Sequence, residues 1–275
     1  MDLKRNIDSK ELWGDDALPN TKTVFDSCLG YSATPGWAYI QYTIKKVFNG
    51  FEELNTIELG CGEGKVSLLF SLLGAKTTLV DYSPKQLNRA KYIADKFEVT
   101  PLIIEENLLR LPRSLCGCYD ISMSFGTAEH FFGEDRQAIF DVHCQVLRKG
   151  GLCILWVPNR YGVLFLFGVK LRRLLHKQVC AIDEIPFTRK ELFFRATHSG
   201  LSQIKVVGGD LLKNDFKNFV LNIHNLFGRF DNKGDNRDIK QMKKILLRSL
   251  IQNKSSIMPW NNYLSYPLIL IGKNL

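Results

Sequence analysis

Short apolar runs alternate with longer amphipathic segments from about residue 34 to the end of the chain. The apolar runs are nearly unbroken, as in strands buried on both faces of a sheet, and the segments between them carry apolar residues at helical spacing. Strands are predicted at 56–59, 76–81, 101–106, 119–125, 152–158, 201–209 and 266–274. This alternation predicts an α/β fold with a doubly wound parallel sheet, which has helices on both faces.

Helix starts are marked by capping residues. Thr34 and Ser83 are each followed by proline, a residue favoured at the first position of a helix, and Thr188 precedes a further amphipathic segment. A helix is predicted to begin directly after each of these three residues. Two more helices are predicted over 65–74 and 134–151, the second ending in a pair of glycines.

A glycine-rich loop follows the first predicted strand, with glycines at positions 60, 62 and 64. On a sheet of this kind such a loop holds either a dinucleotide or S-adenosyl-L-methionine. The dinucleotide pattern GxGxxG would place its third glycine at Lys65, and the phosphate-binding pattern GxxxxGK[ST] fails because Val66 follows the lysine. The spacing therefore gives little support to a pyrophosphate ligand.

Two acidic residues flank this loop in the predicted sheet. Glu58 lies two residues before the first glycine, where it would repel a pyrophosphate but attract a ligand that carries a sulfonium and an ammonium group. Asp81 ends the second strand, where an acidic side chain accepts hydrogen bonds from ribose hydroxyls. Glu58 therefore favours S-adenosyl-L-methionine as the ligand, while Asp81 suits a dinucleotide equally well.

Five segments resemble, in order and spacing, the motifs of the class I S-adenosylmethionine-dependent methyltransferases. They are IELGCGEGK, LVDYSPKQLNRAK, EENLLRLP, YDISMSFGTAEHF and VLRKGGLCILWVPN. The resemblance covers about residues 34–208, and the strand at 266–274 completes the sheet. It implies a Rossmann-like, seven-stranded sheet in the order 3-2-1-4-5-7-6, with the last strand antiparallel and with helical insertions.

The same resemblance implies roles for individual residues. Glu58 would bind the amino group of the cofactor, and the loop would line its methionine end through Gly60, Cys61, Gly62 and Gly64. Asp81 would bind the ribose hydroxyls. The adenine would contact Tyr82, Asn107 and Leu108, and the floor beneath the methyl group would be formed by Phe125 and Gly126.

His130 is the candidate catalytic base, because it follows the fourth strand and a histidine can accept a proton near neutral pH. The alternative is that it only fixes the loop, and Glu129 is expected to be structural, bonding amides of the following turn. Some related quinone O-methyltransferases hold a metal with an ExxEH cluster. Gly126 stands at the first position of that cluster here, so no metal is expected.

Additions around the common core are expected to select the acceptor. Residues 1–33 are predicted to cap the cofactor site, and residues 34–275 to form the methyltransferase domain. Within it, 159–187 is predicted to be a lid insertion, with an interfacial helix that recruits anionic lipid as the alternative. Residues 209–262 form a basic, helical insertion. Aromatic walls for the site are expected from Trp13, Tyr31 and Trp37.

The composition and charge of the chain indicate its cellular compartment and the kinds of partner it could bind. The start of the chain has no apolar signal segment, and no apolar run is long enough to span a membrane, which leaves only peripheral membrane contact open. The seven cysteines are odd in number and scattered, which favours a reducing, cytoplasmic compartment. The net charge of +9 would suit an acidic acceptor or nucleic acid.

The sequence therefore predicts a cytoplasmic S-adenosylmethionine-dependent methyltransferase. Its acceptor is expected to be a small molecule or a glycan or lipid precursor, methylated at oxygen. Two alternatives stay open: an RNA methyltransferase that uses the basic insertion, and a non-catalytic scaffold that binds S-adenosylmethionine. The segment SFGTAEHF lacks the Asn/Asp-Pro-Pro-Tyr/Phe motif of base-methylating relatives, which makes an RNA methyltransferase the less favoured reading.

Overall fold

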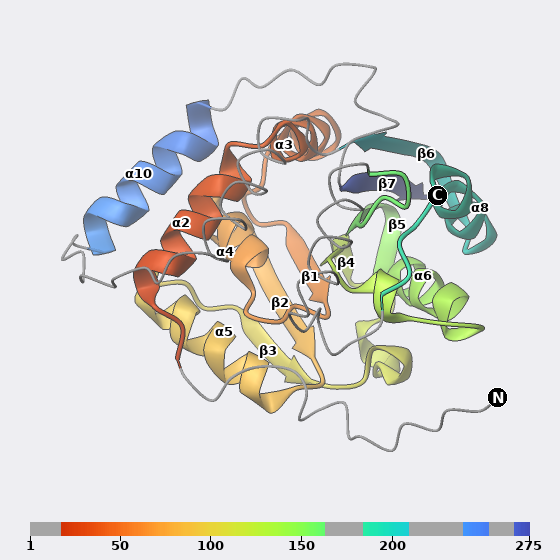
Figure 1. Cartoon of the computed structure of the whole chain (residues 1–275), viewed down its shortest axis with the longest axis horizontal. Helices are drawn as coiled ribbons and strands as arrows, with labels where there is room; N and C mark the ends of the chain where they lie inside the picture. The colour runs from red at the N-terminus through yellow and green to blue at the C-terminus, as the bar shows by residue number, and fades with distance from the viewer. Residues whose placement is uncertain (1–17, 163–183, 209–238, 253–266) are drawn as a thin grey trace, which may run out of the picture.

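A computed structural model describes residues 18–162, 184–208, 239–252 and 267–275 (Figure 1). Its seven strands form one sheet in the order β3-β2-β1-β4-β5-β7-β6, which confirms the predicted fold. Strand β7 runs antiparallel to β5 and β6, and the other neighbouring pairs are parallel. The strands are β1 (Asn55–Leu59), β2 (Lys76–Asp81), β3 (Leu102–Glu105), β4 (Tyr119–Phe125), β5 (Leu147–Val157), β6 (Leu201–Gly208) and β7 (Leu268–Asn274).

Helices cover both faces of this sheet (Figure 1). One face packs against α2 (Thr21–Ser32), α3 (Pro35–Phe48), α4 (Lys65–Leu72), α5 (Pro84–Lys96) and α10 (Ile239–Gln252). The other face packs against α6 (Asp135–Val146) and α8 (Arg189–His198). Because the parallel strands point the same way, the loops that leave their carboxyl ends gather at one edge of the sheet.

The predicted helix caps are confirmed. Thr34 Oγ1 accepts a hydrogen bond from the Trp37 amide at 3.0 Å, and Thr188 Oγ1 accepts one from the Glu191 amide at 3.1 Å. Ser83 caps α5 in the same way, with Pro84 in the first turn. These side chains satisfy amides that would otherwise have no partner at the start of a helix.

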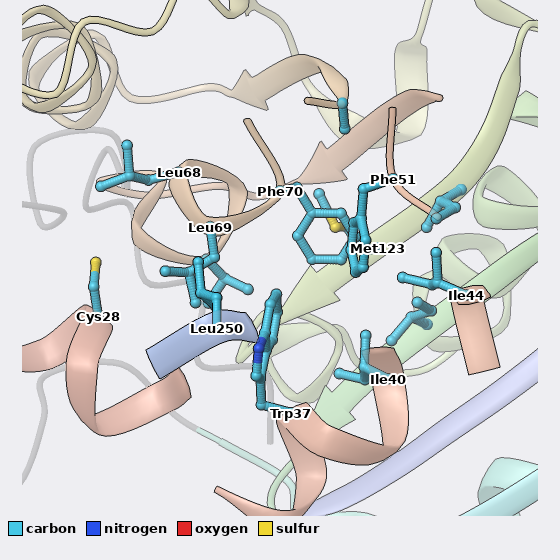
Figure 2. Packing of buried hydrophobic residues seen from close by; sticks show 14 of the residues in the cluster. Cys28, Trp37, Ile40, Ile44, Phe51, Leu68, Leu69, Phe70, Met123 and Leu250 are labelled. Carbon is cyan, nitrogen blue, oxygen red and sulfur yellow. The ribbon is translucent and has the colours of Figure 1, made fainter. Parts of the chain in front are cut away.

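An aromatic cluster fills the core beneath α3 (Figure 2). The Trp37 ring meets the Phe70 ring edge to face at 5.5 Å and stacks on the Phe51 ring at 6.4 Å. Trp37 is only 1% exposed. The expectation that Trp37 walls the cofactor site is therefore wrong, because its first-turn position on α3 turns the ring into the core.

Two elements depart from the sequence prediction. Helix α2 lies within the segment that was expected only as a cap, and Asn20 caps it by accepting from the Lys22 and Thr23 amides. Strand β5 begins at Leu147 instead of residue 152, because Leu147 pairs with Tyr119 before the register shifts to Ile121 and Leu152. A positive φ of 81° at Gly150 accommodates the extra residues.

Helix α10 is the described part of the basic insertion, and it packs on α2. Met242, Leu246 and Leu250 are buried on one side of the helix. Ser32 Oγ lies 2.7 Å from Ser249 Oγ, and Gln41 Nε2 donates to the Leu250 carbonyl at 2.8 Å. The rest of that insertion, Trp13, and most of the predicted lid lie outside the described residues. No helix within the described ranges is long and apolar enough to cross a membrane.

Candidate cofactor and methyl-transfer site

The glycine loop turns sharply at the carboxyl end of β1 and is bonded to the neighbouring strand. The amides of Gly60 and Cys61 both donate to the Val80 carbonyl, at 2.8 and 3.0 Å. The Gly64 amide closes the turn by donating to the Cys61 carbonyl at 2.8 Å. Burial raises the pKa of the Cys61 thiol well above its usual value, so this side chain stays neutral and packs in the turn.

Gly60 is the tightest position of the loop. Its φ is +71°, in the left-handed region that side chains other than glycine rarely adopt. A Cβ placed there would lie 2.3 Å from Thr127 Cγ2, while Thr127 Oγ1 donates to the Gly60 carbonyl at 2.9 Å. The loop after β4 therefore closes directly on the loop after β1, and it leaves space for backbone only.

Asp81 holds the loop from the end of β2. Its Oδ2 accepts from the Gly62 amide and its Oδ1 from the Ser83 amide, both at 2.9 Å. Burial raises the pKa of Asp81, while the amides of Ser83, Gly62 and Tyr82 partly offset the rise. The carboxylate is thus fixed in direction, and its two oxygens retain acceptor capacity for hydroxyl groups of a ligand.

Glu58 lies in β1, its side chain reaches the first turn of α4, and it is only 2% exposed. Its carboxylate accepts a hydrogen bond from Ser67 Oγ at 2.5 Å and another from the Ser67 amide. Burial raises the pKa of Glu58 to about 8, and the nearby Asp81 adds to the rise. A carboxylate already fills the place where a helix N-terminus would bind phosphate, so the site suits a cationic ligand group instead.

A partly buried ion-pair cluster braces the loop, and the sequence analysis missed it. Glu63 pairs with Lys65 at 2.6 Å and with Arg89 of α5. Burial opposes ionisation of Glu63, but the two cations outweigh it and lower its pKa. An acid inside the loop and a cation in the middle of α5 were the signals available in the sequence.

The residues expected at the adenine lie together beside β2 and β3. Leu108 is buried, while Tyr82 is partly exposed and Asn107 is exposed. The amide of Glu106 donates to the Asp81 carbonyl at 3.0 Å, which ties this segment to the end of β2. The side-chain oxygen of Asn107 accepts from the Leu109 amide at 2.9 Å and starts a short 3-10 turn. Its amide group is the part left to face a ligand.

On the other side of β1, strands β4 and β5 end in aromatic residues. The ring centroids of Phe125 and Trp156 are 6.0 Å apart, and Trp156 meets Tyr31 of α2 edge to face at 6.1 Å. The amide of Gly126 donates to the Trp156 carbonyl at 2.9 Å, which joins the two strand ends. Trp156 was missed from the sequence, although its position near the end of a strand that follows Phe125 was a signal.

Glu129 and His130 follow β4 in a 3-10 turn. Glu129 is 3% exposed, and its Oε2 has no hydrogen-bond partner among the described residues. Burial raises the pKa of Glu129 to about 8, and a hydrogen bond from its own amide and the charge of Arg136 partly offset the rise. The expectation that it bonds amides of the following turn finds no support, since the backbone amide that bonds it is its own. His130 is partly exposed beside it.

His143 is excluded from this site by its position in the core between α6 and β4. Its Nδ1 lies 2.5 Å from Ser122 Oγ, and burial lowers its pKa to about 3, so the ring is neutral. Within the part of the chain that the structure describes, no group of three or more His, Cys, Asp or Glu side chains could hold a metal ion.

The sheet order, the glycine loop and the two flanking acids agree with what the resemblance to class I S-adenosylmethionine-dependent methyltransferases implies. Residues 57–155 match a family model described as a methyltransferase domain.

The chain is similar to the ubiquinone biosynthesis O-methyltransferase of Colwellia psychrerythraea, with 28% identity over 116 residues, which is 41% of this chain and 45% of that protein. A second similar protein of the same name, from Rickettsia prowazekii, is 24% identical and covers 47% of this chain and 51% of its own. The chain thus spans about half the length of the curated relatives it matches. The fold also resembles the magnesium protoporphyrin IX methyltransferase of Synechocystis, with a TM-score of 0.52, 15% identity and coverage of 74% and 87%.

Proposed function

We propose that this protein transfers a methyl group from S-adenosyl-L-methionine to a hydroxyl oxygen of a small molecule. The observation that carries the proposal is the pair of fixed, buried acids, with Glu58 of β1 bonded to Ser67 in the first turn of α4 and Asp81 bonded to the Gly62 amide. The curated relatives are named as O-methyltransferases, and the Synechocystis structure contains bound S-adenosylhomocysteine. The names of the relatives support oxygen as the acceptor atom here, and the Synechocystis structure supports the cofactor.

The residues present fit this cofactor. Asp81 would accept hydrogen bonds from the ribose hydroxyls, and the partly protonated Glu58 would ionise to meet the positive charge of the methionine end. The backbone at Gly60, which carries no Cβ, would be the part of the loop that lies closest to the cofactor. The adenine side would be formed by Tyr82, Asn107 and Leu108, and the methionine side by Cys61, Gly62, Gly64, Phe125 and Gly126.

When bound, the cofactor supplies a methyl group on a sulfonium, which passes to the acceptor oxygen and leaves S-adenosylhomocysteine, a methyl ether and one proton. The protein must orient the acceptor, exclude water and receive that proton. His130 is the proposed acceptor of the proton, because it is partly exposed and directly follows the strand that ends in Phe125. Glu129 lies beside it as a buried carboxyl that can hydrogen-bond a hydroxyl or the imidazole.

Isothermal titration calorimetry with S-adenosylmethionine and S-adenosylhomocysteine tests the cofactor. We expect micromolar binding to the full chain and a loss of about 10- to 100-fold in affinity for Asp81→Asn, because one or two charge-assisted hydrogen bonds are weakened. Asp95→Asn on the exposed side of α5 is the matched control and should bind as the unsubstituted protein does. Absence of binding at millimolar cofactor, or equal affinities for all three proteins, would refute the proposal.

We further place the reaction in the cytoplasm, within a methyltransferase domain of residues 34–275 that is preceded by the cap segment 1–33. The lid 159–187 and the basic insertion 209–262 are the proposed acceptor-selecting segments. An RNA acceptor is not proposed, since the relatives reported above are named for ubiquinone biosynthesis.

A further inference from the structure

Two exposed cysteines stand two positions apart in the turn that leads into β4. Cys116 and Cys118 flank Gly117, and both side chains are exposed. The other cysteines within the described ranges are buried or partly buried: Cys28, Cys61, Cys144 and Cys153. Burial raises the pKa of Cys28 to about 12, which keeps a core thiol of this kind protonated and unreactive. The turn is therefore where the described part of the chain presents thiols to solutes.

The backbone of this turn is held in place by the end of α6. The Gly117 amide donates to the Gln145 carbonyl at 2.9 Å, and the Cys118 amide donates to the Val146 carbonyl at 3.1 Å. Gly117 has a φ of +70°, in the left-handed region, and a Cβ built there would meet no atom within 4 Å beyond its chain neighbours. The two thiols thus belong to a fixed, sharply turned backbone with open space beside it.

The thiol of Cys118 is folded back toward Cys116. Its Sγ donates to the Cys116 carbonyl at 3.4 Å and to the Ser114 carbonyl at 3.2 Å. A disulfide requires Cα atoms about 4.4–6.8 Å apart, a range that holds for the residues on either side of the central residue of a turn. Exposed side chains rotate readily, so the two sulfurs can meet while the backbone keeps its hydrogen bonds.

The charges near the turn suit an anionic solute. Residues 108–118 include two exposed arginines, Arg110 and Arg113, and no acid. The acid that follows, Asp120, is buried and is paired with Arg148. A small disulfide that carries carboxylates, such as glutathione disulfide, is therefore attracted to this surface.

We propose that Cys116 and Cys118 form a thiol–disulfide exchange site, which glutathione disulfide oxidises to a disulfide within the turn. Because the Cys118 sulfur is hydrogen-bonded to two carbonyls, Cys116 attacks first: its thiolate bonds to one sulfur of glutathione disulfide and releases one glutathione. The Cys118 thiolate then attacks the Cys116 sulfur and releases the second glutathione. The two cysteines lose two electrons and two protons, which the two released glutathione molecules carry.

This turn lies at the opposite end of β4 from the proposed cofactor site. It precedes Tyr119, the first residue of the strand, whereas Phe125 is the last. The inference is therefore independent of the proposed function, and circular dichroism rather than cofactor binding checks that each variant is folded.

The test treats the reduced full chain with glutathione disulfide and measures its intact mass. The product should be lighter by two hydrogen atoms and carry no glutathione, and the tryptic peptide 114–136 should contain the bridge. Cys118→Ser should stop at the mixed disulfide and accumulate about tenfold more glutathione adduct than the unsubstituted protein. Cys144→Ser, at a partly buried cysteine, is the matched control and should form the bridge as the unsubstituted protein does.

Phenylarsine oxide gives a second measurement, because its arsenic binds two thiols tightly only when they are close together. The unsubstituted protein should bind one equivalent, and either Cys116→Ser or Cys118→Ser should weaken binding by about tenfold or more. A stable glutathione adduct on the unsubstituted protein, a bridge to a cysteine outside the turn, or the absence of any reaction would overturn the inference. Formation of the bridged product by Cys118→Ser would overturn it as well.

Discussion

Gly60→Ala is the substitution for which the structure gives the most direct stability prediction. The added methyl group would stand 2.3 Å from Thr127 Cγ2 and 2.7 Å from Thr127 Oγ1, well inside van der Waals contact. Thr127 must then move, and its hydrogen bond to the Gly60 carbonyl would be lost or lengthened. The contact between the loops after β1 and β4 is therefore what the substitution breaks.

The magnitude can be assembled from three contributions. A left-handed backbone costs alanine about 1–2 kcal/mol relative to glycine. Overpacking against Thr127 adds about 1–2 kcal/mol, and the lost hydrogen bond adds about 1 kcal/mol. The free energy of unfolding should thus fall by about 3–5 kcal/mol, together with cofactor affinity.

Gly117→Ala is the matched control for this measurement. Gly117 has a φ of +70°, almost equal to that of Gly60, but a Cβ there would have no atom within 4 Å. Urea unfolding followed by circular dichroism should give a loss of only about 1–2 kcal/mol for the control. If both substitutions destabilise equally, steric closure by Thr127 is not what requires glycine at position 60. Adding Thr127→Ala to Gly60→Ala should recover the overpacking contribution.

Three further predictions concern other parts of the fold. Burial raises the pKa of Glu58 to about 8 from an ordinary 4.5, so its contribution to stability is fully present below pH 4.5 and is lost as the pH rises to about 8. Glu58→Gln should therefore become more stable relative to the unsubstituted protein as the pH is raised from 5 to 8. A difference in urea midpoints that does not change over this range would refute this prediction. Arg136→Met should lower the free energy of unfolding by about 2–3 kcal/mol through loss of charged hydrogen bonds and of the contact with Phe187, measured in the same assay. Leu246→Ala, in the buried face of α10, should cost about 2–4 kcal/mol, whereas Ile251→Ala, at a side chain that is 70% exposed, should change stability by about 0.5 kcal/mol or less.

The sheet was predictable because its signals are local. The strands 76–81 and 119–125 are found with the predicted bounds, since each is a short run of β-branched or alternating apolar residues that ends before a helix cap or a glycine. The caps at Thr34, Ser83 and Thr188 are equally local, because one side chain bonds an amide of the next turn. Strand order followed from the resemblance of the motifs.

The parts that escaped prediction depend on contacts between distant residues. Helix α2 has a glycine within it and a weak apolar stripe, and it is stabilised by packing on α4 and α10. The early start of β5 depends on pairing with Tyr119, which no local pattern in the segment reveals. The place of Trp156 beside Tyr31 follows from tertiary packing in the same way.

The bonds between α10 and the first helices have a consequence for how the chain is synthesised. Ser32 and Ser249 are 217 positions apart, and Gln41 and Leu250 are 209 apart, so neither pair can form until the last tenth of the chain is being made. Contacts of such long sequence separation form late and slowly, because the intervening chain must be ordered first. The helix that carries Tyr31 therefore leaves the ribosome with its outer apolar side uncovered, and a nascent chain of this protein would need protection from aggregation until α10 has emerged.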